Sequence, residues 1–173
     1  MGDRKVLLRD ALPADARAVA SVHVRAWQVG YRGLIAQEYL DALRPEDRAS
    51  RYTFGSADPA HPTTIVATEA GVVRGFATVG GSRDVHDART GELLACYVDP
   101  DAWRRGIGRL LETEARARLA SLGFTSAVLW VLERNNRAQR FYRAVGWESD
   151  GVARTEECWG VLVNELRFRR ALF

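Results

Sequence analysis

Residues 92–109 read Glu92-Leu-Leu-Ala-Cys-Tyr-Val-Asp-Pro-Asp-Ala-Trp-Arg-Arg-Gly-Ile-Gly-Arg109. The apolar run from Glu92 to Val98 predicts a strand, which the Asp-Pro pair that follows would end. Two glycines then open an amphipathic helix over residues 106–122, and Gly123 is placed to cap its end. A strand that leads through a glycine turn into a helix predicts an α/β fold with a ligand site where the helix begins.

The turn itself has the properties of an anion site. The N–H groups in the first turn of a helix have no intrahelical partner and lie at the positive end of the helix dipole. Gly106 and Gly108 have no side chains, so a phosphate can approach the backbone N–H groups there, including that of Ile107. Three arginines can add charge-assisted hydrogen bonds: Arg104, Arg105 and Arg109.

Two well-known phosphate motifs do not fit this turn. A dinucleotide fold needs a third glycine, and position 111 is Leu111. A P-loop needs Lys and then Ser or Thr after its last glycine, and Gly108 is followed by Arg109 and Leu110. The sequence therefore indicates a pyrophosphate site of another kind, with a purely structural tight turn as the alternative.

The rest of the chain extends the α/β pattern on both sides. Further strands are predicted over residues 6–9, 63–69, 72–80 and 126–132, and further helices over residues 14–27, 36–43, 46–52 and 136–145. Residues 81–90 are predicted to form a loop, and residues 156–168 a last pair of short strands or one long strand. Strand–helix–strand order in the second half implies parallel pairing, and the central hairpin implies a mixed sheet.

Composition limits the class of protein. The 173 residues are 47% hydrophobic and 27% charged, which suits one globular domain over residues 1–173. No apolar run reaches the ~20 residues of a membrane span, and residues 1–6 lack the apolar stretch of a signal peptide. Cys96 and Cys158 have no metal-ligand spacing and are expected to be reduced thiols in a cytoplasmic protein.

The net charge of +3 does not by itself indicate nucleic acid as a partner. The 25 basic residues are spread along the chain and interleaved with 22 acidic residues, without the basic stripe and interleaved aromatics of a nucleic-acid binder.

Two motifs resemble those of one family. Trp103-Arg-Arg-Gly-Ile-Gly-Arg-Leu-Leu111 resembles motif A of the GNAT superfamily of N-acetyltransferases, although Trp103 stands where that family has Arg or Gln. Asn135-Asn-Arg-Ala-Gln-Arg-Phe-Tyr142, followed by Gly146-Trp147, resembles its motif B. The resemblance covers nearly the whole chain and is strongest over residues 92–147.

The resemblance implies a single-domain GNAT-like α/β fold, with a central mixed, mostly antiparallel sheet of 6–7 strands flanked by about four helices. It implies transfer of an acetyl group from acetyl-CoA to a primary amine of a small molecule or peptide, by direct attack in a ternary complex. The alternative is a GNAT-like module that binds acetyl-CoA without catalysis. The resemblance implies no metal, nucleic-acid or membrane partner, and homodimers are common among such folds.

The resemblance also assigns the cosubstrate site. The backbone amides of residues 104–109 are expected to make most of the contacts with the pyrophosphate. The main chain of Cys96, Tyr97 and Val98 is expected to bond the pantetheine arm, and their N–H groups are the candidate donors to the reacting carbonyl oxygen. Asn135 is expected to contact CoA or to cap the helix that starts near Asn136. For the capping role, Asn136 is the preferred candidate.

Two residues are candidates for proton transfer. In the family, the tyrosine at the place of Tyr142 lies near the CoA sulfur, so Tyr142 is the candidate general acid; the alternative is a core tyrosine. Glu92 is the candidate general base, because its offset from Gly106 resembles that of the base in the histone acetyltransferase branch. The alternatives are a solvated Glu92 and a chain of water molecules.

The acceptor amine is the least determined part. The family builds its acceptor pocket from the first helices and the loop before the last strand. Trp27 and Tyr31, four residues apart on one predicted helix, are the candidate acceptor-binding residues, with cation–π attraction as the physical reason. The alternative for each is an aromatic core position. Other residues of this region are His23, Tyr39, Glu156 and Glu157.

Overall fold

The computed structural model describes residues 5–84 and 87–173. Its strands are β1 (Val6–Asp10), β2 (Thr63–Glu69), β3 (Val72–Gly81), β4 (Thr90–Val98), β5 (Ser126–Leu132), β6 (Glu148–Cys158) and β7 (Val161–Ala171). Its helices are α1 (Ala16–Gly30), α2 (Gln37–Ala42), α3 (Pro45–Ala49), α4 (Ile107–Ser121) and α5 (Asn136–Ala144), with 3₁₀ turns η1 (Pro13–Asp15) and η2 (Pro100–Ala102).

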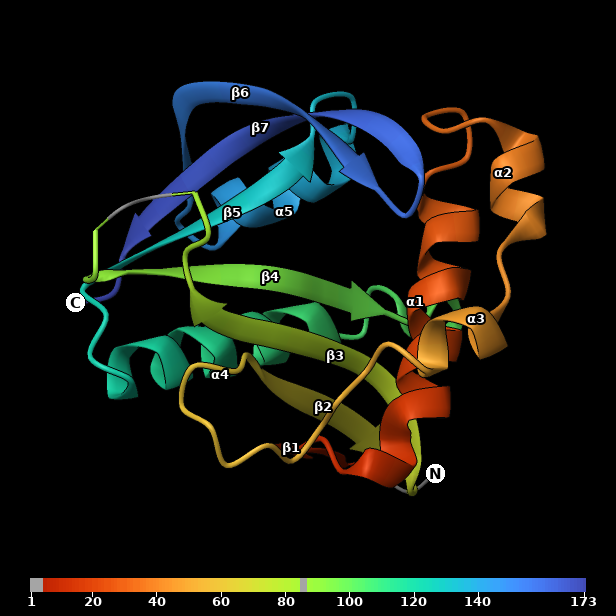
Figure 1. The fold of residues 1–173 in the computed structure, drawn as a ribbon, viewed down its shortest axis with the longest axis horizontal. Helices are drawn as coiled ribbons and strands as arrows, with labels where there is room; N and C mark the ends of the chain where they lie inside the picture. Colours follow the sequence, from red (N-terminus) through yellow and green to blue (C-terminus); the bar gives the residue numbers. More distant parts are fainter. Residues whose placement is uncertain (1–4, 85–86) are drawn as a thin grey trace.

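The seven strands form one sheet in the order β1-β2-β3-β4-β5-β7-β6 (Figure 1). Every neighbouring pair is antiparallel except β4 and β5, which are parallel. The expected α/β fold with a mixed, mostly antiparallel sheet is therefore confirmed. Five α-helices accompany the sheet where about four were expected.

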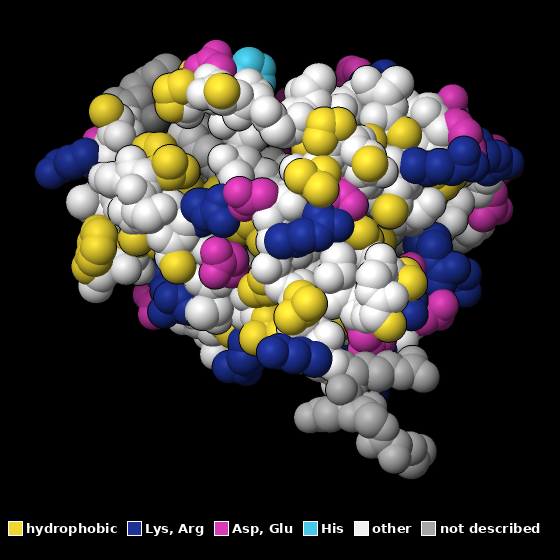
Figure 2. All heavy atoms as spheres, turned by 90° about the horizontal axis from the view of Figure 1, so that it is seen from below, with side chains coloured by type: hydrophobic (Ala, Val, Ile, Leu, Met, Phe, Trp, Pro, Cys, Tyr) yellow, Lys and Arg dark blue, Asp and Glu magenta, His cyan; other side chains and the backbone are white. Residues whose placement is uncertain are grey.

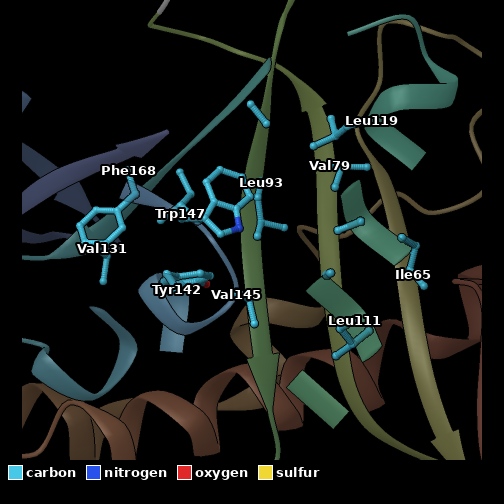
Figure 3. Packing of buried hydrophobic residues seen from close by; sticks show 14 of the residues in the cluster. Ile65, Val79, Leu93, Leu111, Leu119, Val131, Tyr142, Val145, Trp147 and Phe168 are labelled. Carbon is cyan, nitrogen blue, oxygen red and sulfur yellow. The ribbon is translucent and has the colours of Figure 1, made fainter. Parts of the chain in front are cut away.

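Successive side chains of β2 pack in different apolar clusters, which shows that helices cover both faces of the sheet. Ile65 and Ala67 belong to the apolar cluster that contains Leu111 of α4, whereas Val66 packs in a separate cluster with Val19 of α1. Because neighbouring side chains of a strand point to opposite faces, α4 and α1 lie on opposite sides of the sheet. Figure 3 shows the α4-side cluster, in which Trp147 lies against Leu93.

A buried carboxylate joins α4 to the turn after α5. Glu112 has no exposed surface, and its Oε1 accepts hydrogen bonds from Trp147 Nε1 at 2.9 Å and Arg116 Nε at 2.6 Å. The other oxygen, Oε2, is buried without a hydrogen-bond partner among the described residues, so the two donors satisfy only one side of the carboxylate. These bonds fix the end of α5 beside α4, which matters because both helices contribute to the site described below.

Several element boundaries differ from the sequence expectations. The segment predicted as a last pair of short strands or one long strand is a hairpin of two long strands, and β6 begins at Glu148 rather than near residue 156. The early part of β6 is exposed and polar, and its register shifts between Ser149 and Ala153, around Gly151, so it lacks an alternating pattern. On the predicted amphipathic helix, Leu110 is 45% exposed, whereas Ile107 and Leu111 are buried.

Some expectations concern residues outside those described. The N-terminal segment that was searched for a signal peptide includes residues 1–4, and the predicted loop 81–90 includes residues 85–86. No helix among the described residues combines the length and apolar character needed to cross a membrane.

Candidate active site

The two central strands of the sheet separate soon after they meet. β4 pairs with β5 only from Thr90 to Glu92, opposite residues 126–128. Beyond Glu92, β4 continues to Val98 paired with β3 alone. Strands that diverge leave their facing N–H and C=O groups without ladder partners, and such groups need another source of hydrogen bonds.

A cavity of about 560 Å³, here called the β4–β5 cavity, occupies this separation. Its walls come from β4, β5, the turn that opens α4, and α5, with Ala26 and Tyr31 from the end of α1. Its lining includes every residue from Leu93 to Val98, so one whole strand edge faces an open space. An extended chain that carries hydrogen-bonding groups is the kind of ligand that such an edge accommodates.

The glycine turn forms one end of this cavity. Gly106 is the N-cap residue of α4 and adopts a left-handed conformation with φ of 81°, which favours glycine. No side chain caps the helix there, so the first-turn N–H groups are left for a ligand. A Cβ on Gly108 would lie 3.5 Å from the Phe141 ring, so a side chain at this position would narrow the passage between α4 and α5.

The three arginines of the turn do not share one role. Arg104 and Arg109 line the cavity with Gly106, Ile107 and Gly108. Arg105 does not: its guanidinium forms an ion pair with the buried carboxylate of Glu69 at the end of β2. The structure therefore brings Arg104 and Arg109 to the expected pyrophosphate position and directs Arg105 toward the sheet.

Trp103 has a structural role at the position where the family has Arg or Gln. Its Nε1 donates a 2.8 Å hydrogen bond to the backbone oxygen of Val98, the last residue of β4. The guanidinium carbon of Arg137 lies 3.8 Å from the centroid of the Trp103 ring. Trp103 thus ties the end of β4 to the glycine turn and to α5.

Helix α5 brings two predicted residues to the cavity wall. Asn135 is the N-cap, and its side chain accepts a 3.1 Å hydrogen bond from the N–H of Ala138. The expectation that Asn136 rather than Asn135 caps this helix is therefore wrong, because only the side chain at the N-cap can reach the free N–H groups of the first turn. Asn135 also lines the cavity, so a single position combines the capping role with a place beside the expected CoA site.

Tyr142 lies on the same helix and is 9% exposed. It lines the cavity, and its hydroxyl forms no hydrogen bond with another described residue. Burial raises the pKa of Tyr142 well above 10, with smaller contributions from the neighbouring Cys96 and Tyr97. The phenol is therefore protonated at neutral pH and free to donate to a group in the cavity.

Glu92 lies apart from these groups. Its carboxylate is buried, accepts a 3.1 Å hydrogen bond from the N–H of Arg83 and lies 3.3 Å from the Arg83 guanidinium. It is not among the residues that line the cavity, whose β4 members begin at Leu93. The structure therefore brings Tyr142 together with residues 93–98, Arg104 and residues 106–109, and does not bring Glu92 to them.

The β4 residues predicted to bind the cosubstrate all line the cavity. Burial raises the pKa of the Cys96 thiol to about 12, so this group stays protonated. The hydroxyls of Tyr97 and Tyr31 lie 3.2 Å apart at the end of the cavity near α1. Burial likewise raises the pKa of Tyr97 to about 12, so the pair is neutral.

An aromatic cluster continues from this pair away from the cavity. Its members are His23, Trp27, Tyr31, Tyr52, Tyr97 and Trp159. Trp27 is buried and stacks on Trp159 with ring centroids 4.4 Å apart, so of the two predicted acceptor residues only Tyr31 lines the cavity. Figure 1 shows the β6–β7 tip that carries Trp159 beside α1 and α2.

Sequence reasoning missed Trp159. It lies at the tip of the β6–β7 hairpin with φ of 55°, a left-handed conformation that is unfavourable for a bulky residue. The hydroxyl of Tyr39 donates to its backbone oxygen. The signal available in the sequence was a Trp-Gly pair between two strands, where Asn-Gly is the usual choice.

His23 is neutral in this setting. Its Nδ1 lies 2.5 Å from the hydroxyl of Tyr52. Burial, aided by the positive charge of Arg48, holds the pKa of His23 well below 6.5. The other acceptor-side candidates, Glu156 and Glu157, lie on the exposed part of β6.

Charged side chains alternate in sign over the surface seen in Figure 2, where basic and acidic groups are interspersed. Arg9 pairs with Asp15 and Arg118 with Asp10. Such pairing agrees with the interleaved charges of the sequence.

Comparisons with known proteins agree with this geometry. The sequence model of the Acetyltransferase (GNAT) family matches residues 24–147. The uncharacterized N-acetyltransferase YuaI of Bacillus subtilis is 32% identical over 130 residues, which is 75% of this chain and 73% of YuaI.

Solved structures share the fold at low identity. The PaiA N-acetyltransferase of Thermoplasma acidophilum, in complex with coenzyme A, is 19% identical with a TM-score of 0.73, covering 96% of this chain and 99% of that chain. The structure of yncA from Salmonella typhimurium with acetyl-CoA is 19% identical with a TM-score of 0.71, covering 98% and 95%.

Replacing Gly106 with alanine tests the glycine turn. A Cβ at Gly106 meets no atom within 4 Å, so the change acts through its left-handed backbone, at a cost of about 1–2 kcal/mol. We expect Gly106→Ala to weaken CoA binding roughly tenfold, as measured by calorimetry, because relaxation of the strain turns the first N–H groups of α4. Gly123→Ala, at the other end of α4 with φ of 93° and equally open space, is the matched control. Equal CoA affinity of the two variants would contradict the assignment.

Proposed function

The chain belongs to the acetyltransferase (GNAT) family, and we propose that it transfers an acetyl group from acetyl-CoA to a primary amine of a small molecule or peptide. The expectation of an acyl-CoA-dependent N-acetyltransferase is confirmed at the level of the family. All described strands join one sheet, which supports a single acetyltransferase domain over residues 1–173.

The observation that carries this proposal is the unpaired edge of β4 beside the glycine turn. The edge from Leu93 to Val98 would hold the pantetheine arm as an added strand, and the first turn of α4 would hold the pyrophosphate. Arg104 and Arg109 line the cavity beside that turn and would add charge-assisted bonds. The yncA and PaiA structures, which share the fold, contain acetyl-CoA and coenzyme A.

Acetyl-CoA supplies an activated acyl group, and Tyr142 would donate a proton to the departing sulfur. Its hydroxyl is buried in the cavity wall, protonated and unbonded to other described residues. These are the properties of a general acid. Backbone N–H groups near Tyr97 and Val98 would donate to the oxygen of the acetyl carbonyl.

We further infer direct attack of the amine within a ternary complex. A covalent acyl-enzyme route needs a nucleophile in the cavity, and Cys96 is the cysteine that lines it. Its pKa of about 12 leaves almost no thiolate at neutral pH. Cys158 lies outside the cavity, and burial raises its pKa as well.

The proton of the amine would pass to solvent in the cavity rather than to Glu92. The Glu92 carboxylate is occupied by Arg83, and its side chain lies outside the cavity lining. A base must come within hydrogen-bond reach of the proton that it takes, directly or through one water. Glu92 instead holds the segment after β3 against β4.

The proposed function is tested by a screen of acetyl-CoA consumption across a panel of primary amines. We expect release of CoA that depends on the amine, and formation of the N-acetylated product by mass spectrometry. Tight CoA binding without release for any amine would instead support the non-catalytic module and overturn the proposal.

Tyr142→Phe removes the proposed acid and keeps the ring that packs in the cavity wall. We expect kcat to fall about a hundredfold, the low end of the range for general acid catalysis, with little change in CoA affinity. Because a raised pKa keeps Tyr142 protonated, the wild-type kcat should not fall between pH 7 and 10 through loss of this proton. CoA affinity of the same variant, measured by calorimetry, is the control for an intact cavity. Full turnover by Tyr142→Phe would exclude the role.

Glu92→Gln distinguishes the two candidate bases. If solvent accepts the proton, the dependence of kcat/KM on pH should match that of the wild type, apart from a uniform scale factor. Steady-state rates from pH 5.5 to 9.5 provide the comparison. A profile that loses its acidic limb would assign the base to Glu92.

A further inference from the structure

Arg48 of α3 is a partly buried cation without an acidic partner. Its guanidinium carbon lies 3.5 Å from the centroid of the Trp159 ring. Its Nε is buried and has no hydrogen-bond partner. Within residues 5–84 and 87–173, no carboxylate comes within ion-pair distance of Arg48, whereas its neighbour Glu46 pairs with Arg17.

The groups around Arg48 do not neutralise its charge. Tyr52 and Tyr39 are the neighbouring phenols, and Arg51 adds a second positive charge. Burial lowers the pKa of Arg48, which records the cost of keeping this cation away from water. A partly buried arginine without a carboxylate partner retains its capacity to bind an anion.

Arg48 is connected to the β4–β5 cavity through the aromatic cluster. The Trp159 ring on which it lies is 4.2 Å from the His23 ring, and the His23 ring is 4.5 Å from that of Tyr97. Tyr97 lines the cavity and faces Tyr31. Arg48 therefore lies on the side of Tyr97 that faces α1 and the β6–β7 tip, separated from the cavity by the rings of His23 and Trp159.

We propose that Arg48 binds a carboxylate of the acceptor, so that the substrates are amines that carry a carboxylate several bonds from the reacting nitrogen. The proposal rests on the proposed function and narrows it to one substrate class. The planar guanidinium can donate hydrogen bonds to both carboxylate oxygens. The charge of Arg48 and Arg51 disfavours acceptors with several positive charges.

The first test compares matched acceptors on the wild-type enzyme. Each pair consists of an ω-amino acid and its amide, or a short peptide and its C-terminal amide, which differ only in the negative charge. We expect kcat/KM for the acids to exceed that for the amides by about tenfold to a hundredfold, the usual gain from a charged hydrogen bond. Equal rates within the pairs would overturn the proposal.

The second test uses Arg48→Met, which keeps an apolar stem against Trp159 and removes the charge. We expect the acid-to-amide ratio to fall close to one, mainly through a higher KM for the acids. Arg48→Lys, which keeps the charge without the planar fork, should retain part of the preference. Arg17→Met, whose arginine is an exposed ion-pair partner of Glu46, is the matched control and should retain all of it.

The outcomes separate this proposal from the proposed function. Acetylation of amines without any acid preference would refute the carboxylate site and leave the acetyltransferase proposal intact. Absence of acetylation would refute the proposed function; calorimetric titration of the acids into the CoA-bound protein, wild type against Arg48→Met, would still decide whether Arg48 binds them. If Arg48→Met does not fold, Arg48→Lys and the wild-type ratios decide the question.

Discussion

The separation of β4 from β5 after three paired residues is the constraint on which the site depends. Up to Glu92 the two strands complete each other's ladder, and beyond it β4 exposes an edge inside the molecule. The cavity exists because α4 and α5 pack against this opening without closing it, and the buried Glu112 holds the two helices together through Trp147. The glycine turn is positioned by α4, which it opens, and Tyr142 is positioned by α5.

The sequence was sufficient for the parts of the site that depend on local structure. The strand ending at Val98, the glycine turn, and the helix that carries Tyr142 follow from apolar periodicity and turn residues, and all three line one cavity. Side-chain partners were not predictable, because they depend on residues far apart in the chain. Arg105 turns to Glu69, and Glu92 is bound by Arg83. The polar first half of β6 escaped detection because no buried face gives it a periodic pattern.

The tip of the β6–β7 hairpin illustrates a balance between local strain and tertiary packing. A left-handed conformation costs a bulky residue about 1–2 kcal/mol, so Trp159 would not be chosen for the turn alone. Its ring is held between Trp27 and the guanidinium of Arg48, and each contact contributes an amount comparable to that strain. The hairpin tip is thereby fixed to α1 and α3, the helices that carry Trp27 and Arg48.

The short pairing between β4 and β5 also has a thermodynamic consequence. One part of the sheet, β1 to β4, meets the other, β5 to β7, along only three residue pairs, so little backbone hydrogen bonding joins the two parts. A chain that inserts between the diverging strands supplies bonds that the protein itself lacks. Cosubstrate concentration is then coupled to folding: at a hundred times its dissociation constant, a ligand of the native state alone adds about 2.7 kcal/mol to the free energy of unfolding. The resistance of this protein to heat and proteolysis would therefore follow the supply of acetyl-CoA and CoA around it.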